Sequence, residues 1–363
     1  MRTRKNIYQI KIVVLGNILY CYLIGQNLSL KGMFTLSGLI GDDAPRNLPT
    51  YESSIDYIPT LSIAKELSSN TFLDAEWSYR LKKDYSGDSL YNKIYKNNRL
   101  WARYSSEKIE ARLGLQKIIF GPTQILRSLS WFDTFDIKDP TGQTDGVEAF
   151  RLRWFPSNSI GIWTWAVQND HKIVSYGGRG EISTLLGEWG ITFHHDPTNS
   201  LQMIGQTKVL IDQAHNRMAL DFRYDGFIGF WNESAFLFSK ENNIALVTIG
   251  ADYTLPIATG IMLMTESMLV KDYQIDSNST QTALMASVPL GMVYQLMFIY
   301  QFNWEEKKNY NFLRLTATYD QYALNFIISI NPKRSDYNEA AYFLPNTVAG
   351  FGTNLKFVFM YNH

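Results

Sequence analysis

The sequence predicts an all-β fold, a transmembrane antiparallel β-barrel of about 18 strands, with about 16 strands as the alternative. Three observations predict it. Segments of about ten residues alternate apolar and polar side chains, which suits a tilted strand that crosses a bilayer. The connections between these segments alternate long and short. Aromatic residues make up 14% of the chain, which is typical of proteins whose rings lie at a membrane–water interface.

Residues 1–25 have the pattern of a secretory signal peptide. Basic residues come first (Arg2, Arg4, Lys5 and Lys11), an apolar run follows, and cleavage is expected near Gly25–Gln26. The apolar run is shorter than the roughly 20 residues that a spanning helix needs. A signal anchor is the alternative. The single cysteine, Cys21, lies in this segment, so the expected barrel, residues 26–363, has no disulfide.

Alternating segments follow one another along the rest of the chain. In each, the apolar side chains share one parity and should face lipid, whereas the opposite parity is polar or charged. In chain order the apolar sets are Leu28, Leu30, Phe34 and Leu36; Leu73, Ala75, Trp77, Tyr79 and Leu81; Leu100, Ala102 and Tyr104; Ile109, Ala111, Leu113 and Leu115; Phe150, Leu152 and Trp154; Trp189, Ile191 and Phe193; Met218, Leu220, Phe222 and Tyr224; Tyr294, Leu296, Phe298, Tyr300 and Phe302; and Tyr322, Leu324, Phe326, Ile328 and Ile330.

The connections favour an outer-membrane barrel over a soluble β-sandwich. Long external loops facing short periplasmic turns are typical of such barrels, and an even number of strands places both termini on the periplasmic side. The predicted long connections are Gly38–Asp56, Ile119–Gly146, Asp196–His215 and Pro332–Ala349; a medium one is Lys82–Leu90; the short ones include Leu67–Asn70, Ser105–Glu107, Pro156–Ser159 and Asp225–Gly226.

The connection 119–146 is unusually apolar. A long segment without periodicity is either functional or disordered, and its apolar side chains argue against disorder. It is therefore predicted to fold into the lumen, with Trp131 and Phe132 as a constriction, because apolar side chains in bulk water would be costly. Arg127, Asp133 and Asp136 would then line the constriction. Alternatively, the loop caps the outside of the barrel.

The last segment, Thr353–His363, alternates Leu355, Phe357, Phe359 and Tyr361. It resembles the C-terminal strand by which outer-membrane proteins are recognised for assembly. The resemblance implies the barrel-assembly machinery as a partner. His363 stands where an aromatic residue, usually Phe, closes the series.

A wider resemblance covers residues 95–240. Arg112–Pro122, RLGLQKIIFGP, resembles the R-x-G-x-Q…G segment of outer-membrane porin-like barrels, including the alginate-export type. WFDTFD and DGVEAFRLRW, further along, resemble the Asp-rich loop and return strand of those barrels. A wider set of segments is similar to an uncharacterised group of Gram-negative outer-membrane proteins: GRGE at Gly178–Glu181, GEWGITFHH at Gly187–His195 and LDFRYDGFIGFWNESA at Leu220–Ala235. The resemblance implies a transport-type barrel and no particular substrate; alginate is not carried over, because the expected lumen has mixed charge.

Side chains of the polar parity are expected to face the lumen. They place mainly basic residues on one part of the wall and mainly acidic residues on another, which would orient dipolar solutes in a pore. Alternatively, the charges pair with their neighbours and stabilise a plugged barrel. The predicted pore-lining basic residues are Arg99, Arg103, Arg112, Arg151 and Arg153, and the acidic ones are Glu181, Glu188, Asp221, Glu233, Asp252 and Glu266.

Enzymatic and cofactor-binding functions have little support. His194 and His195 are adjacent on a predicted strand, so their side chains point to opposite faces and cannot share a metal ion. The spacing of serines and acids singles out no catalytic group. We therefore expect no enzyme activity, no metal and no cofactor.

The sequence thus predicts a porin-like channel in the cell outer membrane, through which small polar solutes diffuse passively. The alternative is a non-conducting barrel that serves as a scaffold or subunit of a surface secretion or uptake complex. Membrane lipid is the expected partner, assembly into a homo-oligomer is left open, and the charge balance suggests no nucleic-acid partner.

Overall fold

The computed structural model describes residues 27–169, 172–204, 209–257, 259–337 and 344–363. The predicted signal peptide, residues 1–25, and Cys21 lie outside the described residues. Within the described part of the chain, no helix has the length and apolar character needed to cross a membrane.

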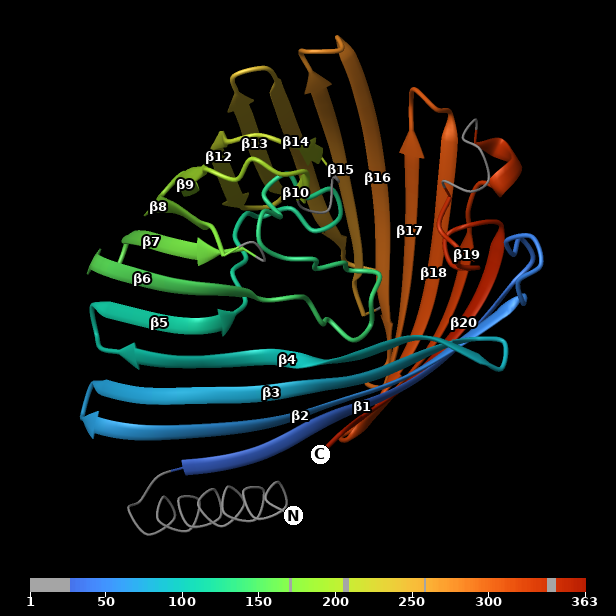
Figure 1. The fold of residues 1–363 in the computed structure, drawn as a ribbon, viewed down its shortest axis with the longest axis horizontal. Coiled ribbons are helices and arrows are strands. Elements are labelled where there is room, and N and C mark those ends of the chain that lie inside the picture. Colours follow the sequence, from blue (N-terminus) through green and yellow to red (C-terminus); the bar gives the residue numbers. More distant parts are fainter. Residues whose placement is uncertain (1–26, 170–171, 205–208, 258, 338–343) are drawn as a thin grey trace, which may run out of the picture.

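The protein is a closed antiparallel β-barrel of 18 strands, as predicted (Figure 1). Each wall strand pairs with the next along the chain, β9 pairs with β12, and β20 closes the wall by pairing with both β19 and β1. The wall strands are β1 (Asn27–Gly41), β2 (Tyr51–Ser68), β3 (Thr71–Ser86), β4 (Ser89–Ser105), β5 (Ile109–Gln116), β6 (Val147–Ser157), β7 (Ile160–Gln168), β8 (Val174–Thr184), β9 (Gly187–Asp196), β12 (His215–Asp225), β13 (Gly229–Ser239), β14 (Asn243–Leu255), β15 (Ile261–Asp272), β16 (Ser277–Leu290), β17 (Tyr294–Asn303), β18 (Lys308–Thr318), β19 (Tyr322–Ile330) and β20 (Thr353–Asn362).

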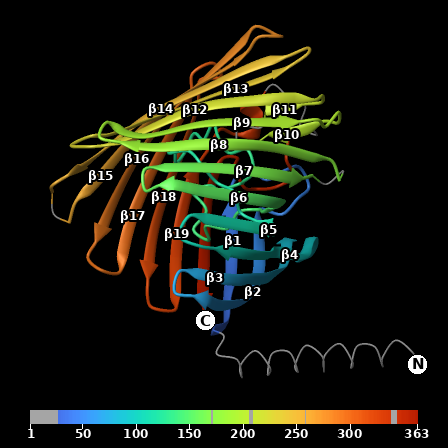
Figure 2. The same ribbon diagram turned by 90° about the vertical axis from the view of Figure 1, so that its left-hand side faces the viewer.

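Two small elements lie outside the wall. The strands β10 (Gln202–Ile204) and β11 (Val209–Ile211) form a separate hairpin in the connection between β9 and β12. A short 3₁₀ turn, η1 (Arg334–Asp336), lies between β19 and β20. The turned view shows β6 to β9 as neighbouring strands of one curved wall (Figure 2).

The outer face of the barrel is apolar. Side chains of the predicted lipid-facing parity are exposed, for example Leu113 (63%), Ile191 (60%) and Phe326 (53%). Their neighbours along the strands point inward, and many of these are buried, such as Thr192 at 1%. An exposed apolar face that runs around a closed wall is the surface that a lipid-spanning barrel presents to acyl chains.

Both chain ends of the described barrel lie at the same end. Gly32, near the start of β1, and His363 exchange two backbone hydrogen bonds of 2.9 and 3.0 Å. Along this rim, which we call the turn end, neighbouring strands join through short turns. The longer connections, which join β1 to β2, β5 to β6, β9 to β12 and β19 to β20, leave and re-enter the wall at the opposite end, which we call the loop end.

The predicted loop 82–90 is mostly strand instead. The ladder of β3 and β4 continues to Ser86↔Ser89, and Gly87 turns the chain with a φ of +59°. The segment is polar on both faces, so it lacks the alternation that marks a membrane-crossing strand. Both faces of a hairpin that projects beyond the bilayer meet water, which accounts for the missing signal.

Residues 117–146, which we call the internal loop, run through the middle of the barrel (Figure 1). Their apolar side chains pack against inward-facing residues of the wall from β6 to β15. This packing gives the barrel a core between loop and wall. Its buried members include Ile118, Phe120, Leu129, Trp131, Phe132, Ala149, Trp163, Trp165, Val167, Ala219, Ala235, Leu237, Ile244 and Leu246.

Candidate functional site: the lumen and its internal loop

Two fully buried carboxylates hold the internal loop to the wall. Glu233, on β13, accepts hydrogen bonds from the backbone N–H groups of Thr123 and Leu129, both at 3.0 Å. Glu266, on β15, accepts three, from Gln124 (2.8 Å), Ile125 (2.9 Å) and Leu126 (2.7 Å).

A carboxylate has enough lone pairs for this number of donors, and bonds to a charged acceptor are about twice as strong as neutral ones. Glu266 also accepts a 3.1 Å hydrogen bond from the Trp231 indole. Gly121 lets the chain approach closely: its φ is +91°, and a Cβ there would lie 2.1 Å from a Glu233 carboxylate oxygen. These two acids were predicted to line a pore. The structure differs from that expectation, because their oxygen atoms are covered by loop backbone.

The loop is also bound within itself. The Arg127 guanidinium pairs with the Asp133 carboxylate, and both side chains are almost completely buried. Asp133 also accepts a 3.0 Å hydrogen bond from the Phe135 N–H. Ser128 reaches the wall through a 2.7 Å hydrogen bond with Thr248. Arg127 and Asp133 therefore rigidify the loop and do not face the lumen, contrary to the prediction.

Asp136 is the third charged residue predicted for the constriction. Its carboxylate accepts the Lys138 N–H at 2.9 Å, which closes a local turn. The Lys138 side chain then reaches Gln301 on β17 at 3.2 Å, and Arg314 on β18 donates to the Ile137 carbonyl at 3.2 Å. The later part of the loop is thus tethered to a second part of the wall.

An aromatic cluster fills the space between loop and wall. Phe120 packs against Trp131 and against Trp165 of β7, with ring centroids 5.7 Å apart in both cases. Phe132 lies 5.0 Å from the ring of His194, which accepts a 3.2 Å hydrogen bond from the Trp165 indole. Trp131 and Phe132 are therefore buried in a packed cluster.

The five predicted basic residues all point into the barrel. On the β4–β6 wall, Arg103 pairs with Asp74 at 2.8 Å, and Arg151 pairs with Glu110 at 2.7 Å. Arg112 lies 3.8 Å from the same Glu110. Arg153 stacks over the Trp163 ring at 4.0 Å, and Arg99 donates to the Thr144 carbonyl of the loop at 2.7 Å.

Glu110 is thus shared by arginines from three strands. Arg103, at 3.5 Å, is the third of them. Asp74 and Glu110 are the two carboxylates that pair with Arg103, Arg112 and Arg151. The five arginines of β4 to β6 outnumber them, so this part of the lumen is electropositive. A charge excess inside a low-dielectric wall focuses the field in the enclosed space.

Among the other predicted acids, two pair with the same buried arginine. Arg179 of β8 pairs with Asp221 at 2.6 Å and with Glu181 at 2.7 Å. Glu188 and Asp252 lie near the turn end of the barrel, where each lines a cavity. Much of the predicted acidic surface is thus occupied by internal partners, which agrees with the alternative of paired charges.

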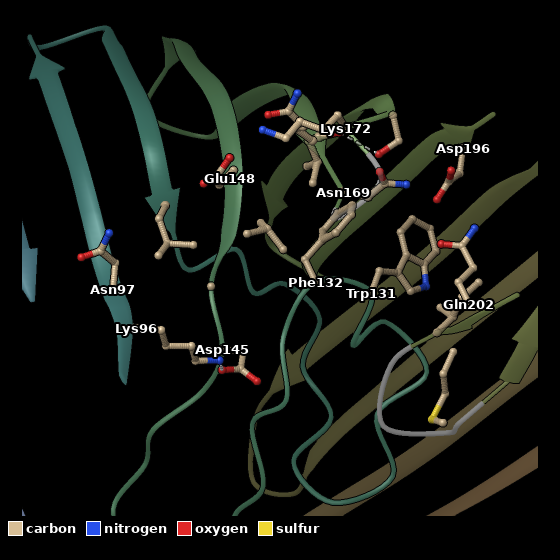
Figure 3. Close-up of a pocket in the computed structure, with 18 of the residues that line it drawn as sticks. Lys96, Asn97, Trp131, Phe132, Asp145, Glu148, Asn169, Lys172, Asp196 and Gln202 are labelled. Carbon is tan, nitrogen blue, oxygen red and sulfur yellow. Dashed lines mark hydrogen bonds and ion pairs between the residues drawn. The ribbon is translucent and has the colours of Figure 1, made fainter. Parts of the chain in front are cut away.

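Cavities remain around the internal loop. One of them, at the loop end, has a volume of about 550 Å³ (Figure 3). Trp131 and Phe132 form part of its lining, with Lys96 and Asp145 to one side and Asp196 to the other. Lys96 and Asp145 pair at 3.0 Å.

A second cavity, of about 320 Å³, lies between the loop and the β1–β3 wall and is lined by residues that include Arg80, Lys82 and Asp139. A third, of about 360 Å³, lies under the loop toward the turn end and contains Gly121, Arg179 and Glu188. Cavities lined by charged side chains thus lie on both sides of the loop.

His194 and His195 point to opposite faces, as predicted. His194 is buried in the aromatic cluster, whereas His195 packs on the outward-facing Tyr176 with ring centroids 5.2 Å apart. Within the described ranges, no group of three His, Cys, Asp or Glu side chains could hold a metal ion.

Sequence reasoning missed the inward tryptophans Trp163 and Trp165. In β7, IGIWTWAVQ, both parities are largely apolar, so alternation does not distinguish the face that packs on the loop. The available signal was the pair of large aromatic residues two positions apart, which lie on the same face of a strand.

Comparison with known proteins agrees with this architecture. Neither a protein-family model nor a curated protein matches the sequence. Solved structures match over nearly the whole chain. OccAB1 of Acinetobacter baumannii matches with a TM-score of 0.61 at 8% identity, covering 94% of this chain and 97% of its own. OccK5 (OpdH) of Pseudomonas aeruginosa gives 0.57 at 8% identity, covering 93% and 97%. A mutant of the Rh. blastica porin gives 0.52 at 11% identity, covering 93% and 100%.

The fold is that of outer-membrane porins. At these identities the likeness extends to the fold alone. The outer-membrane porin fold and the apolar outer face confirm the predicted architecture, a transmembrane antiparallel β-barrel.

Proposed function

We propose that the protein is an outer-membrane channel through which small polar solutes diffuse passively beside the internal loop. The observation that carries the proposal is the coincidence of an apolar outer face with a charged lumen that retains cavities on both sides of the loop. Solutes would meet the electropositive β4–β6 wall on one side and the loop on the other. Residues 1–25 would direct secretion, and β20 would be the strand that the assembly machinery recognises.

Planar-bilayer recording of the refolded protein tests this proposal. Discrete conductance steps at low voltage are expected, with a selectivity that depends on the lumen charges. If the barrel shows the heat-dependent gel shift of a folded protein but conducts at no voltage, the channel function is refuted, although the fold is not.

One observation favours a second function, that of a non-conducting scaffold in a surface complex. Five backbone N–H groups of the loop are bound by Glu233 and Glu266, so the loop is held firmly inside the barrel. Liposomes that contain the protein but do not swell in small sugars, together with a stoichiometric partner after native purification, would favour this function over a channel.

A further inference from the structure

The short turns at the turn end differ in character between the two halves of the rim. Four consecutive hairpin turns expose large apolar side chains with no charged residue in the turn. They are Leu185 (103% exposed) and Leu186 (72%) between β8 and β9, Phe227 (82%) and Ile228 (51%) between β12 and β13, Ile257 (56%) between β14 and β15, and Met292 (102%) between β16 and β17.

The other four turns contain polar or charged residues. Ser69 and Asn70 join β2 to β3, and residues 106–108, of sequence Ser-Glu-Lys, join β4 to β5. Asn158 and Ser159 join β6 to β7, and Tyr319, Asp320 and Gln321 join β18 to β19, so this last turn pairs one exposed aromatic ring with two polar residues. The apolar turns are therefore gathered on one continuous half of the rim, from β8 to β17, and are not scattered around it.

Fully exposed leucine, methionine and phenylalanine side chains are unfavourable in water, and a contiguous set of them marks a surface that something apolar covers. The structure indicates lipid as the cover, because the apolar turns continue the lipid-facing wall. Phe227 packs on Tyr253, an outward-facing residue of β14, with ring centroids 5.1 Å apart.

Exposed aromatic rings sit on the outer face directly above the apolar turns. Trp189 follows the β8–β9 turn, Tyr224 precedes the β12–β13 turn, and Tyr294 follows the β16–β17 turn. Trp and Tyr at such positions prefer the headgroup level of a bilayer. The apolar tips lie beyond these rings, where a barrel seated evenly in the membrane would place them in water.

We propose that these four turns insert into the periplasmic leaflet of the membrane, so that the β8–β17 half of the barrel sits deeper than the half with polar turns. The barrel axis is then tilted relative to the membrane normal, and the lipid headgroups reach higher on the β8–β17 side of the wall than on the opposite side. An inclined seating follows from unequal apolar height around a wall, because bilayers accommodate such a mismatch by tilt and by local deformation.

Site-directed spin labelling tests the proposal. The single cysteine makes this simple: in the full chain with Cys21→Ser, one new cysteine is introduced at a time and labelled with a nitroxide. The three sites are an apolar turn (Met292→Cys), a polar turn (Ser159→Cys) and the middle of the lipid-facing wall (Ile191→Cys). Each protein is refolded into phosphatidylcholine vesicles, and only variants with the heat-dependent gel shift of a folded barrel are compared.

The quantity measured is the accessibility of the label to oxygen, which partitions into lipid, relative to a water-soluble nickel chelate. The ratio for position 292 is expected to exceed that for position 159 several-fold and to approach that for position 191. A ratio equal to that of position 159 would overturn the proposal. A label protected from both reagents would also overturn it, because a protein surface would then cover the rim. Leu186→Cys repeats the comparison if the label at position 292 prevents folding.

Discussion

Replacing Glu266 by glutamine should loosen the internal loop while the wall stays intact. The carboxylate binds the N–H groups of Gln124, Ile125 and Leu126 and the Trp231 indole with both of its oxygens. Glutamine keeps one acceptor oxygen and turns the other acceptor into an NH₂ group. Two buried N–H groups then face a donor and lose their partner.

The magnitude follows from these lost contacts. Each buried N–H left without an acceptor costs about 1–3 kcal/mol, so two of them cost about 2–6 kcal/mol. The wall strands β14 to β16 keep their ladder hydrogen bonds, because the side chain takes no part in them. The penalty therefore falls on the loop, which the variant holds less tightly, and not on closure of the barrel.

Trypsin reports the state of the loop, because Arg127 lies in the segment that Glu266 holds. In the folded wild-type protein in detergent, Arg127 is buried and cleavage there should be slow. Glu266→Gln should raise the cleavage rate at Arg127 by at least tenfold while the heat-dependent gel shift is retained. Glu188→Gln, at an exposed glutamate near the turn end, is the matched control and should behave as wild type. Equal cleavage rates for Glu266→Gln and wild type would refute the role of the carboxylate as an anchor.

Three further predictions concern stability and selectivity. Gly121→Ala should lower the free energy of unfolding by about 1–3 kcal/mol in urea titration, since the glycine has positive φ and the new Cβ meets a buried carboxylate. Gly142→Ala, also at positive φ but in open space, should lower the free energy of unfolding less, and an equal decrease in both variants would contradict the clash. Arg127→Ala should destabilise the protein by about 3–5 kcal/mol, because Asp133 is left charged and buried without its partner. Adding Asp133→Leu to this variant should recover part of the thermal stability, and no recovery would contradict the pairing. Glu110→Gln should shift the reversal potential in a salt gradient toward anion selectivity, because the arginines around it lose a counter-charge; an unchanged reversal potential would show that ions do not pass this wall.

The wall of the barrel could be predicted from the sequence because lipid imposes a simple rule on it. Every second residue of a crossing strand meets acyl chains, so Leu113, Ile191 and Phe326 stood out at once. The rule weakens in β7, where the loop presents an apolar surface on the inside as well. It also fails in the hairpin of β3 and β4, where residues 82–90 meet water on both faces.

The interior was harder to predict because its main contacts join side chains to backbone. Glu233 and Glu266 were correctly placed on the inward parity, but their partners are N–H groups of the loop, which leave no mark on residue type. Likewise, Arg127 and Asp133 appear in the sequence as two charges in a loop. Only the turn between them, which brings the two side chains together, shows that they neutralise each other.

The central claim is that water and ions pass through the lumen beside a loop that occupies part of it. The most direct measurement is the single-channel conductance of the wild-type barrel and of a variant in which residues 120–144 are replaced by a short Gly-Ser linker, both checked for the heat-dependent gel shift. We predict a measurable conductance for the wild type and a several-fold larger one for the variant. Equal conductances, or none in either protein, would contradict the account.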